Sequence, residues 1–240
     1  MVDRTAIAVM AKAPQQGAVK TRLTPPLQPA AAALLSESFL IDITATLHAA
    51  ARTAPITPFL AYAPRGAEAR LEAIIAAGTR LVLADGGSVA EPGVCGIGRG
   101  LLQAARRLVA QGYGAVSLVS ADAPTLPATI LAEAAHALAR PGERMVLGPA
   151  ADGGYYLIGL KAPHRRLFQD IAWSSETVAA ETVSRAREIG LEVVLLPTWY
   201  DVDDEATLGR LRQALARGAE QAPATKAALA RLGLIEGAVE

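Results

Sequence analysis

The chain has 240 residues, and its 23 Lys and Arg balance its 23 Asp and Glu, so its formal net charge is zero. This balance argues against a nucleic-acid-binding surface, which requires a clear basic excess. One cysteine, Cys95, excludes an intramolecular disulfide and a cysteine-only metal cluster. The first apolar run, residues 6–10, is too short for a signal peptide or a membrane span. We therefore expect a cytoplasmic protein that has neither nucleic acid nor membrane as a partner.

Two hydrophobic periods alternate along the chain. Strands are predicted at residues 6–10, 56–62, 80–84, 115–119, 145–148, 155–160 and 192–196. Helices are predicted at residues 29–51, 67–77, 98–111 and 127–139, from a cap at Ser174 or Ser175 to 188, from a cap at Asp203 or Asp204 to 217, and at 224–232. This alternation predicts an α/β fold, in which helices cover both faces of a mostly parallel sheet. We expect a single domain, residues 1–240, with residues 218–240 as a C-terminal helical appendage.

A basic segment follows the first strand. It carries Lys12, Lys20 and Arg22, and Gly17 permits a tight backbone turn. Ligands of open α/β sheets bind beyond the carboxyl ends of the strands, and cations there suit a polyphosphate. The alternative is a solvated connection with three ordinary surface cations. The spacing matches neither a Walker loop nor the GxGxxG fingerprint.

Acidic residues follow two later strands. Asp122 comes just after the strand at 115–119, where a carboxylate suits Mg²⁺ or Mn²⁺, although a helix cap or an Asx turn is the alternative. Asp201 and Asp203 belong to a group of four carboxylates in residues 201–205, which is more than a helix cap needs. We predict that at least one of these four binds a cation.

The remaining candidates are weaker. Asp152, Gly153 and Gly154 lie between two strands and are typical of a turn. Tyr155 and Tyr156 alternate along a strand, so one of them faces a helix layer and the other is available to an acceptor pocket. The two tryptophans, Trp173 and Trp199, are interpreted as core or homodimer contacts rather than base-stacking platforms.

Five segments together resemble one bacterial protein family. They are Ala-Lys-Ala-Pro-x-x-Gly-x-Val-Lys-Thr-Arg-Leu from Ala11, Ser-Ala-Asp-Ala-Pro-Thr-Leu from Ser120, Gly-Pro-Ala-x-Asp-Gly-Gly-Tyr-Tyr-Leu-Ile-Gly-Leu from Gly148, Ile-x-Trp-Ser-Ser from Ile171, and Asp-Val-Asp from Asp201. The chain is similar in these segments to DUF2064, or selenodomain-associated transferase 1. The resemblance implies the glycosyltransferase-A fold, also called the nucleotide-diphospho-sugar transferase fold, a three-layer α/β/α sandwich.

The resemblance also implies a set of site residues. A divalent metal cofactor, Mg²⁺ or Mn²⁺, is expected on Asp122 with Asp201 or Asp203, and Lys20 and Asp122 are expected to be catalytic. The donor nucleotide and its phosphates are expected on Ala11, Lys12, Gly17, Lys20, Arg22 and Arg99. The small-molecule acceptor is expected on Asp152, Gly153, Gly154, Tyr155, Trp173 and Ser174. The chain departs from the family pattern in the Gly-rich segment 92–100, where Arg99 takes the place of a family arginine, and at Ser175, where relatives carry threonine.

Two reactions fit this pattern. Asp122 is followed by Ala-Pro rather than by the Asp-x-Asp of many sugar transferases, and the basic segment suits a triphosphate, so nucleotidyl transfer from a nucleoside triphosphate to a small phosphorylated acceptor is favoured. Glycosyl transfer from a nucleotide sugar is the alternative, and a nucleotide-binding regulator without turnover is the second alternative. Lys20 and Arg22 are expected in a solvated mouth. The acidic side chains are expected to repel one another without a cation.

Overall fold

The computed structural model describes residues 2–236. Its centre is a seven-stranded sheet in the order β3-β2-β1-β4-β6-β5-β7. The strands are β1 (Val2–Lys12), β2 (Ile56–Ala63), β3 (Arg80–Leu83), β4 (Tyr113–Ser120), β5 (Arg144–Pro149), β6 (Tyr155–Leu160) and β7 (Glu192–Leu195). Strand β6 pairs antiparallel with β4 and β5, and the other pairs are parallel. The mostly parallel sheet is therefore confirmed.

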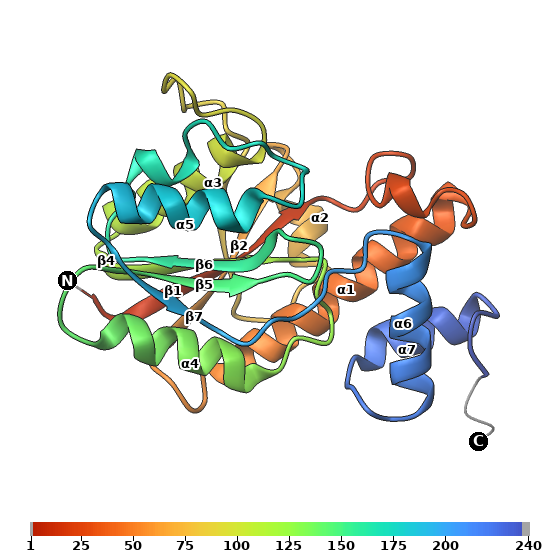
Figure 1. Cartoon of the computed structure of the whole chain (residues 1–240). Helices are drawn as coiled ribbons and strands as arrows, with labels where there is room; N and C mark the ends of the chain where they lie inside the picture. Colours follow the sequence, from red (N-terminus) through yellow and green to blue (C-terminus); the bar gives the residue numbers. More distant parts are fainter. Residues whose placement is uncertain (1, 237–240) are drawn as a thin grey trace.

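Helices cover both faces of this sheet. They are α1 (Pro29–Ala50), α2 (Glu68–Glu72), α3 (Ile97–Ala110), α4 (Ala128–Ala139), α5 (Val178–Glu188), α6 (Glu205–Ala216) and α7 (Pro223–Arg231), with 3₁₀ turns η1 (Thr21–Leu23) and η2 (Arg165–Phe168). Figure 1 shows α1 and α4 on one face of the sheet and α3 and α5 on the other, while α6 and α7 lie beyond one end. The fold is the expected three-layer α/β/α sandwich.

The first strand shows why its sequence is apolar throughout. Ile7 and Val9 belong to the core on the α1 and α4 face, whereas Ala6 and Ala8 belong to the core on the α3 face. Successive side chains of a strand point to opposite faces, so a strand covered on both sides must be apolar at every position. The small alanines allow α3 to approach the sheet closely. The strand thereby delivers Lys12 to the carboxyl edge.

A third, smaller core joins distant parts of the chain. The first half of α1 packs there against η1, α6 and α7, with Phe39, Leu211 and Leu229 almost fully buried. Asp42 of α1 accepts hydrogen bonds from the backbone N–H groups of Ala224 and Thr225 at the start of α7, at 3.0 and 2.7 Å. Such N–H groups have no partner within their own helix, so Asp42 anchors α7.

Helix α1 is long and apolar enough to cross a membrane by length and composition. However, 56% of its most apolar window is buried inside the molecule. Leu40, Ile43 and Leu47 pack in the core beneath the sheet, and the first half of the helix packs against α7. Its apolar composition is therefore explained by burial on two sides.

Two predicted helix boundaries are wrong. The helix expected over 67–77 ends at Glu72, because the chain bends there and the N–H of Ala76 donates to Thr44 Oγ1 at 3.1 Å instead of continuing the helix. Helix α5 begins after Thr177 rather than at Ser174 or Ser175. The hydroxyl of Ser175 instead lies 2.8 Å from Thr177 Oγ1.

The helix predicted after the last strand begins as expected. Asp204 is its N-cap and accepts a hydrogen bond from the backbone N–H of Thr207 at 2.8 Å, while the Thr207 hydroxyl accepts one from the N–H of Asp204 at 3.1 Å. This reciprocal pair is a capping box. Asp204 is thus used structurally, which removes it from the candidate cation ligands.

Candidate functional site

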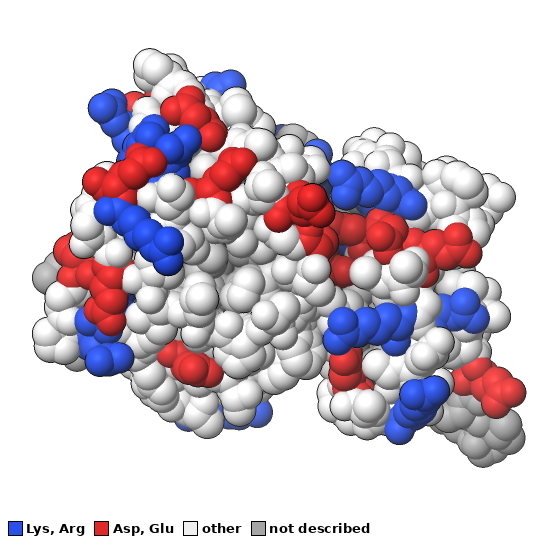
Figure 2. All heavy atoms as spheres, viewed as in Figure 1, with Lys and Arg blue, Asp and Glu red and all other residues white. Residues whose placement is uncertain are grey.

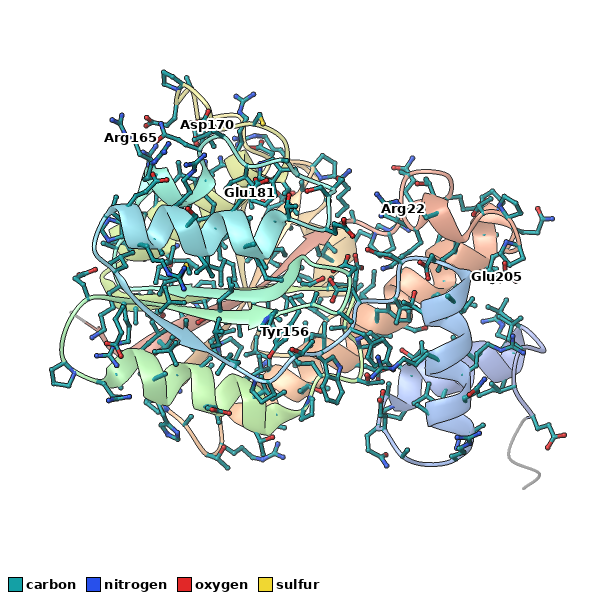
Figure 3. All side chains as sticks on the ribbon, viewed as in Figure 1. Arg22, Tyr156, Arg165, Asp170, Glu181 and Glu205 are labelled. Atoms are coloured by element: carbon teal, nitrogen blue, oxygen red, sulfur yellow. The ribbon has the colours of Figure 1, made fainter. Side chains whose placement is uncertain are left out.

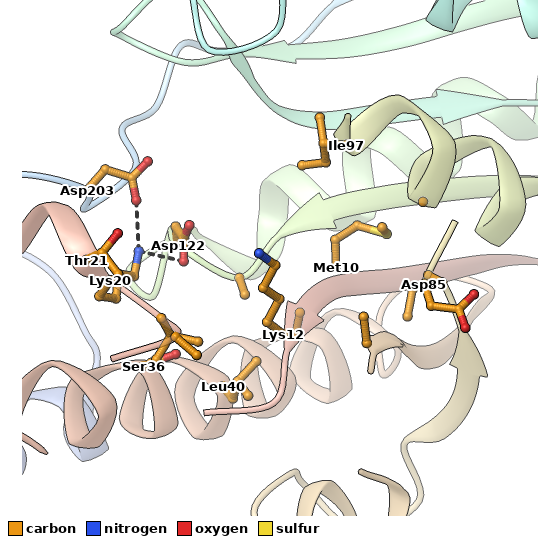
Figure 4. A pocket seen from close by; sticks show the side chains of 18 of the residues that line it. Met10, Lys12, Lys20, Thr21, Ser36, Leu40, Asp85, Ile97, Asp122 and Asp203 are labelled. Atoms are coloured by element: carbon orange, nitrogen blue, oxygen red, sulfur yellow. Dashed lines mark hydrogen bonds and ion pairs between the residues drawn. The ribbon is translucent and has the colours of Figure 1, made fainter. Parts of the chain in front are cut away.

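A cavity of about 650 Å³ lies at the carboxyl ends of β1, β2, β3 and β4. Met10 and Lys12 of β1 line its middle, Asp85 follows β3 at one end, and Asp122 follows β4 at the other. Figure 4 shows this order, with Lys12 and Met10 between the cluster at Lys20 and the side chain of Asp85. The cavity therefore lies where ligands of open α/β sheets bind, beyond the carboxyl ends of the strands.

An ionic cluster closes one end of the cavity. Lys20 Nζ lies 2.6 Å from Asp122 Oδ1 and 3.0 Å from Asp203 Oδ1, and it donates to the carbonyl oxygen of Val202 at 2.7 Å. The Lys20 side chain is only 4% exposed, whereas the Asp122 and Asp203 side chains are each 38% exposed. The two carboxylates therefore face the cavity, and the ammonium group is held behind and between them (Figure 4).

Local backbone geometry builds this cluster. Lys20 has a left-handed backbone, with φ of 50°, just before η1, whose Leu23 is fully buried. The N–H of Val202 donates to the carbonyl oxygen of Asp122 at 2.8 Å, which ties the segment after β7 to the loop after β4. Asp203 is held in turn by its own N–H, which donates to Thr207 Oγ1 at 3.1 Å. Three distant segments are thereby fixed around one lysine.

Burial and charge shift the pKa values of these groups. Burial lowers the pKa of Lys20, but the charges of Asp122 and Asp203 outweigh it and raise that pKa above 10.5. Burial raises the pKa of Asp122, and the Lys20 ammonium only partly opposes it. Burial, reinforced by the charges of Asp122 and Asp203, raises the pKa of Asp201 to about 7. Lys20 therefore stays charged at neutral pH.

The expected metal ligands are brought to one place, but not as a set of three. Within residues 2–236, no three His, Cys, Asp or Glu side chains gather as a metal group. Asp122 and Asp203 both pair with the ammonium group of Lys20. Asp201 Oδ1 is buried without a hydrogen-bond partner from the described part of the chain. Carboxylate oxygens that face a cavity fit a hard divalent cation that keeps water and takes further oxygens from its substrate.

The structure corrects one expectation about this end of the cavity. Lys20 does not lie in a solvated mouth, because its ammonium group is enclosed by two carboxylates and a carbonyl. Lys20 supplies one positive charge for two carboxylates, so it offsets their mutual repulsion only in part, and the charge of Asp203 still contributes to the raised pKa of Asp122. Arg22, in contrast, is exposed and lines the cavity as expected. Figure 3 shows Arg22 on the side of the molecule that carries Glu205.

The other expected donor residues divide into two groups. Ala11 and Lys12 line the cavity, whereas Gly17 and Arg99 do not. Gly17 has φ of 74°, so it serves the turn for which glycine is suited. Arg99 Nε donates to the carbonyl oxygen of Val89 at 2.9 Å, and this bond holds the Gly-rich segment. Its guanidinium group is engaged there and does not line the cavity.

The expected acceptor residues lie outside this cavity. Asp152 Oδ1 accepts a hydrogen bond from the N–H of Gly154 at 2.9 Å, as in a turn, and its charge contributes to the raised pKa of Asp201. Gly153 has φ of 89°, and a Cβ there would overlap the backbone of Glu176. These residues therefore lie near the acidic cluster but not on the lining of the cavity.

The aromatic residues of the expected acceptor set, Tyr155 and Trp173, also lie outside the lining of the cavity. The rings of Tyr155 and Trp173 meet edge to face, with centroids 6.4 Å apart, and Trp173 covers Gly96 and Gly98. Ser174 has a left-handed backbone, with φ of 68°. Trp173 is thus a packing residue that supports the start of α3, as its interpretation as a core contact predicts.

Some residues that line the cavity were not predicted from the sequence. Asp85 follows β3 as Asp122 follows β4, but it begins a Gly-rich stretch and was not among the predicted site residues. Met10, Ser36 and Ile97 also line the cavity, and no local pattern distinguishes them from core or surface residues. The strand-end rule alone could have found Asp85.

Acidic and basic side chains gather around the opening. Figure 2 shows Asp and Glu side chains concentrated where the sheet meets the α6 and α7 part of the molecule, with Lys and Arg beside them. This part of the molecule therefore combines carboxylates, which can bind a metal cation, with Lys and Arg side chains, which can bind an anion. This combination is typical of sites for metal-bound phosphates.

Comparisons with known proteins agree with this architecture. A protein from Desulfovibrio desulfuricans G20, provisionally named a nucleotide-diphospho-sugar transferase, has 26% sequence identity and a TM-score of 0.80, with 97% of this chain and 96% of that chain covered.

More distant structures share the fold alone. CMP:2-keto-3-deoxy-manno-octonic acid synthetase in complex with CTP has 11% identity and a TM-score of 0.52, covering 90% of this chain and 99% of that one. The 4-diphosphocytidyl-2C-methyl-D-erythritol synthase of Anaerococcus prevotii DSM 20548 has 10% identity and a TM-score of 0.50, covering 89% and 96%.

Sequence comparison places the chain in a family. No functionally curated protein matches it. The conserved pattern of one family, described as an uncharacterized protein conserved in bacteria, matches residues 46–175, which is more than half of the chain. With the fold and the strand-end cluster in agreement, the protein belongs to the DUF2064 family.

Proposed function

We propose that the protein is a metal-dependent transferase that uses a nucleotide donor. The observation that carries the proposal is the cavity whose one end joins Lys20 to Asp122 and Asp203 at the carboxyl edge of the sheet. Lys12 and Arg22 add two cations to the same cavity. Two carboxylates for a cation and nearby cations for phosphates are what a metal-bound polyphosphate requires.

The favoured reaction is nucleotidyl transfer. An oxygen of a phosphorylated acceptor attacks the α-phosphorus of a nucleoside triphosphate, and the bond to the pyrophosphate leaving group breaks. Mg²⁺ or Mn²⁺ on Asp122 and Asp203 would neutralise charge on the reacting phosphates. With a cation there, Lys20 would be only partly paired with the carboxylates and could donate to a phosphate oxygen, while Lys12 and Arg22 would orient the leaving group. The CMP:2-keto-3-deoxy-manno-octonic acid synthetase, whose structure contains CTP, and the 4-diphosphocytidyl-2C-methyl-D-erythritol synthase share this fold and support the proposal.

Glycosyl transfer is the second candidate, and one observation favours it. The Desulfovibrio protein that shares 26% of the sequence is provisionally named for a nucleotide-diphospho-sugar donor. In that reaction the acceptor hydroxyl attacks the sugar, and a nucleoside diphosphate departs. The same cluster would hold the diphosphate, so the two reactions differ in the product that leaves.

One assay separates these reactions. The purified protein is incubated with Mg²⁺ or Mn²⁺ and either nucleoside triphosphates or nucleotide sugars, together with pooled phosphorylated and hydroxyl acceptors. Pyrophosphate release supports nucleotidyl transfer, and nucleoside diphosphate release from a sugar donor supports glycosyl transfer.

The binding step is tested independently of turnover. Calorimetry measures the affinity of the protein for each Mg²⁺–nucleotide. We expect Asp122→Asn to weaken nucleotide binding in the presence of Mg²⁺ by at least tenfold. Asp170→Asn is the matched control, because Asp170 pairs with Arg166 outside the cavity and asparagine tolerates its φ of 52°. Unchanged metal-dependent binding in Asp122→Asn, or an absence of nucleotide binding in the wild type, would overturn the proposal.

A further inference from the structure

The end of the cavity opposite the ionic cluster is not used by the phosphate chemistry, and its composition is different. Ala61 and Ala84 lie at the ends of β2 and β3, and the start of α3 lies against them. A Cβ on Gly100 would lie 2.8 Å from the carbonyl oxygen of Ala84, so only glycine permits this close approach. Met10 and Ile97 complete the apolar lining. These small and apolar groups line the end of the cavity beside the start of α3 and the sheet edge, and we call this end of the cavity the slot.

The exposure of Ile97 to solvent has no other explanation in the fold. Its side chain is 56% exposed, although it begins a helix whose buried face carries Leu101 and Leu102. A large apolar side chain at the edge of a cavity covers a flat apolar ligand favourably. The Met10 thioether is polarizable and makes favourable contacts with aromatic rings. The slot therefore suits a planar heteroaromatic ring.

One carboxylate lies at this end, and its orientation is fixed. Asp85 Oδ1 accepts hydrogen bonds from the N–H of Gly87 and from Gln103 Nε2, both at 3.1 Å. Gln103 is only 2% exposed, and its Oε1 accepts from the N–H of Gly86 at 2.5 Å. Both bonds go to Oδ1, and no residue in the described range 2–236 donates to Oδ2. The buried glutamine thus holds an acceptor whose second oxygen is available.

This carboxylate remains ionised. Its hydrogen bonds with the N–H of Gly87 and with Gln103 lower the pKa of Asp85. An ionised carboxylate only accepts hydrogen bonds. A ligand group at this position must therefore be a donor.

The separation of the two ends decides which part of a nucleotide lies there. Asp85 follows β3 and Asp122 follows β4, and the order β3-β2-β1-β4 places three strand intervals between them. At about 4.8 Å per interval, this separation is about 14 Å along the sheet edge. The ribose hydroxyls are only a few bonds from the α-phosphate, whereas the outer edge of the base is the most distant part of a nucleotide. The distance therefore fits the base edge.

We propose that this slot binds the base of the donor nucleotide and that Asp85 selects guanine. Guanine presents two adjacent donors, N1–H and the N2 amino group, and the Oδ2 of Asp85 has two lone pairs that can accept both. Adenine and cytosine present one amino donor beside an acceptor, and uracil presents one N–H between two acceptors. The inference rests on the proposed use of a nucleotide donor and adds its base.

The test compares nucleotides that differ by one group. Calorimetry with Mg²⁺ measures the affinity of the wild type for GTP, ITP, XTP, ATP, CTP and UTP. A bidentate contact of this kind discriminates by roughly 10- to 100-fold, so we expect GTP to bind more tightly than the other nucleotides by such a factor. ITP is the sharpest comparison, because it differs from GTP only in lacking the 2-amino donor.

Asp85→Asn tests the residue itself. Asparagine keeps the Oδ1 acceptor for Gly87 and Gln103 but replaces the second acceptor by an amino donor, so the loop is preserved. We expect GTP affinity to fall by roughly 10- to 100-fold and XTP affinity to rise, because the C2 carbonyl of xanthine accepts from the new amino group. Asp170→Asn, outside the cavity, should keep the wild-type order.

The outcomes distinguish this inference from the proposed function. Equal affinity of the wild type for GTP and ITP, or an unchanged order of nucleotides in Asp85→Asn, would overturn the assignment of Asp85 while leaving nucleotide binding intact. A protein that binds no nucleotide at all would overturn both. The comparison of GTP with ITP needs no variant, so it stands even if Asp85→Asn fails to fold.

Discussion

Replacing Lys20 by methionine tests the ionic cluster most directly. The substitution keeps most of the side-chain volume but removes a charge that interacts with two carboxylates at 2.6 and 3.0 Å and with one carbonyl oxygen at 2.7 Å. Asp122 and Asp203 would then face each other without a counter-ion. The protein should therefore become less stable rather than more stable.

The magnitude follows from the exposure of the partners. Breaking a fully buried ion pair costs about 3–5 kcal/mol, whereas exposed pairs contribute about 0–1 kcal/mol. Lys20 is 4% exposed but each carboxylate is 38% exposed, so solvent screens part of the interaction. We expect the free energy of unfolding to fall by about 2 kcal/mol, which lowers the urea midpoint by about 1 M for a typical denaturant slope.

A divalent cation should partly reverse this loss. Without the ammonium group, Mg²⁺ can bind between the carboxylates, and a ligand present at ten times its dissociation constant stabilises the folded state by about 1.4 kcal/mol. The assay is urea unfolding followed by circular dichroism, with and without 10 mM Mg²⁺, on the wild type and on Lys20→Met. The Mg²⁺ effect should be larger in the variant.

Lys12→Met is the matched control. Lys12 lines the same cavity but is exposed and has no ion-pair partner within residues 2–236, so its replacement should change stability by less than about 0.5 kcal/mol. A Lys20→Met protein that unfolds at the wild-type urea concentration would refute the argument that the Lys20 charge stabilises the cluster of carboxylates. An equal effect of Mg²⁺ on the two proteins would refute the cation site.

Other parts of the structure give further predictions. Asp204→Ala removes the capping box of α6 and should cost about 1 kcal/mol in urea unfolding, while Asp204→Asn should cost less. Asp42→Ala leaves two backbone N–H groups at the start of α7 without an acceptor and should cost about 1–3 kcal/mol, with faster proteolysis of the C-terminal helices. Burial raises the pKa of Asp42 above 3.8, so folding favours its protonated form, and the wild type should lose stability relative to Asp42→Asn as the pH rises upward from 4 through the raised pKa. Gly148→Ala would overlap the Tyr156 ring and should lower the unfolding free energy by about 1–3 kcal/mol, whereas Gly209→Ala, where a Cβ meets nothing within 4 Å, should not.

Local patterns predicted the elements well where one period dominates. Strand β1 and helix α1 were expected at residues 6–10 and 29–51, and they occur at Val2–Lys12 and Pro29–Ala50. The prediction failed where a tertiary contact competes with local preference. The chain after Glu72 has a helical composition, but the N–H of Ala76 bonds Thr44 on α1. A partner 32 residues away cannot be predicted from the helix pattern itself.

The functional residues likewise divide into those that a local rule predicts and those whose contacts only the tertiary structure shows. The strand-end rule selected Lys12, Asp122 and Asp203 from the sequence, and the structure brings all three to one cavity. The same rule applies to Asp85, which was not among the residues predicted from the sequence. Arg99 was selected by its place in a motif, and its side chain instead holds the carbonyl oxygen of Val89.

The sequence by itself determined the alternation of strands and helices, the apolar character of the central strand and the acidic and basic character of the strand ends. Those properties depend on hydrogen bonding and side-chain periodicity over a few residues. Only the tertiary structure decided that Lys20 is enclosed by Asp122 and Asp203, and that Asp85 faces them from the far end of one cavity. The reason is the order of the strands. Because β4 pairs beside β1 while β3 lies two strands away from β1 on the other side, the sheet sets which side chains meet, and that order is fixed by packing between segments far apart in the chain.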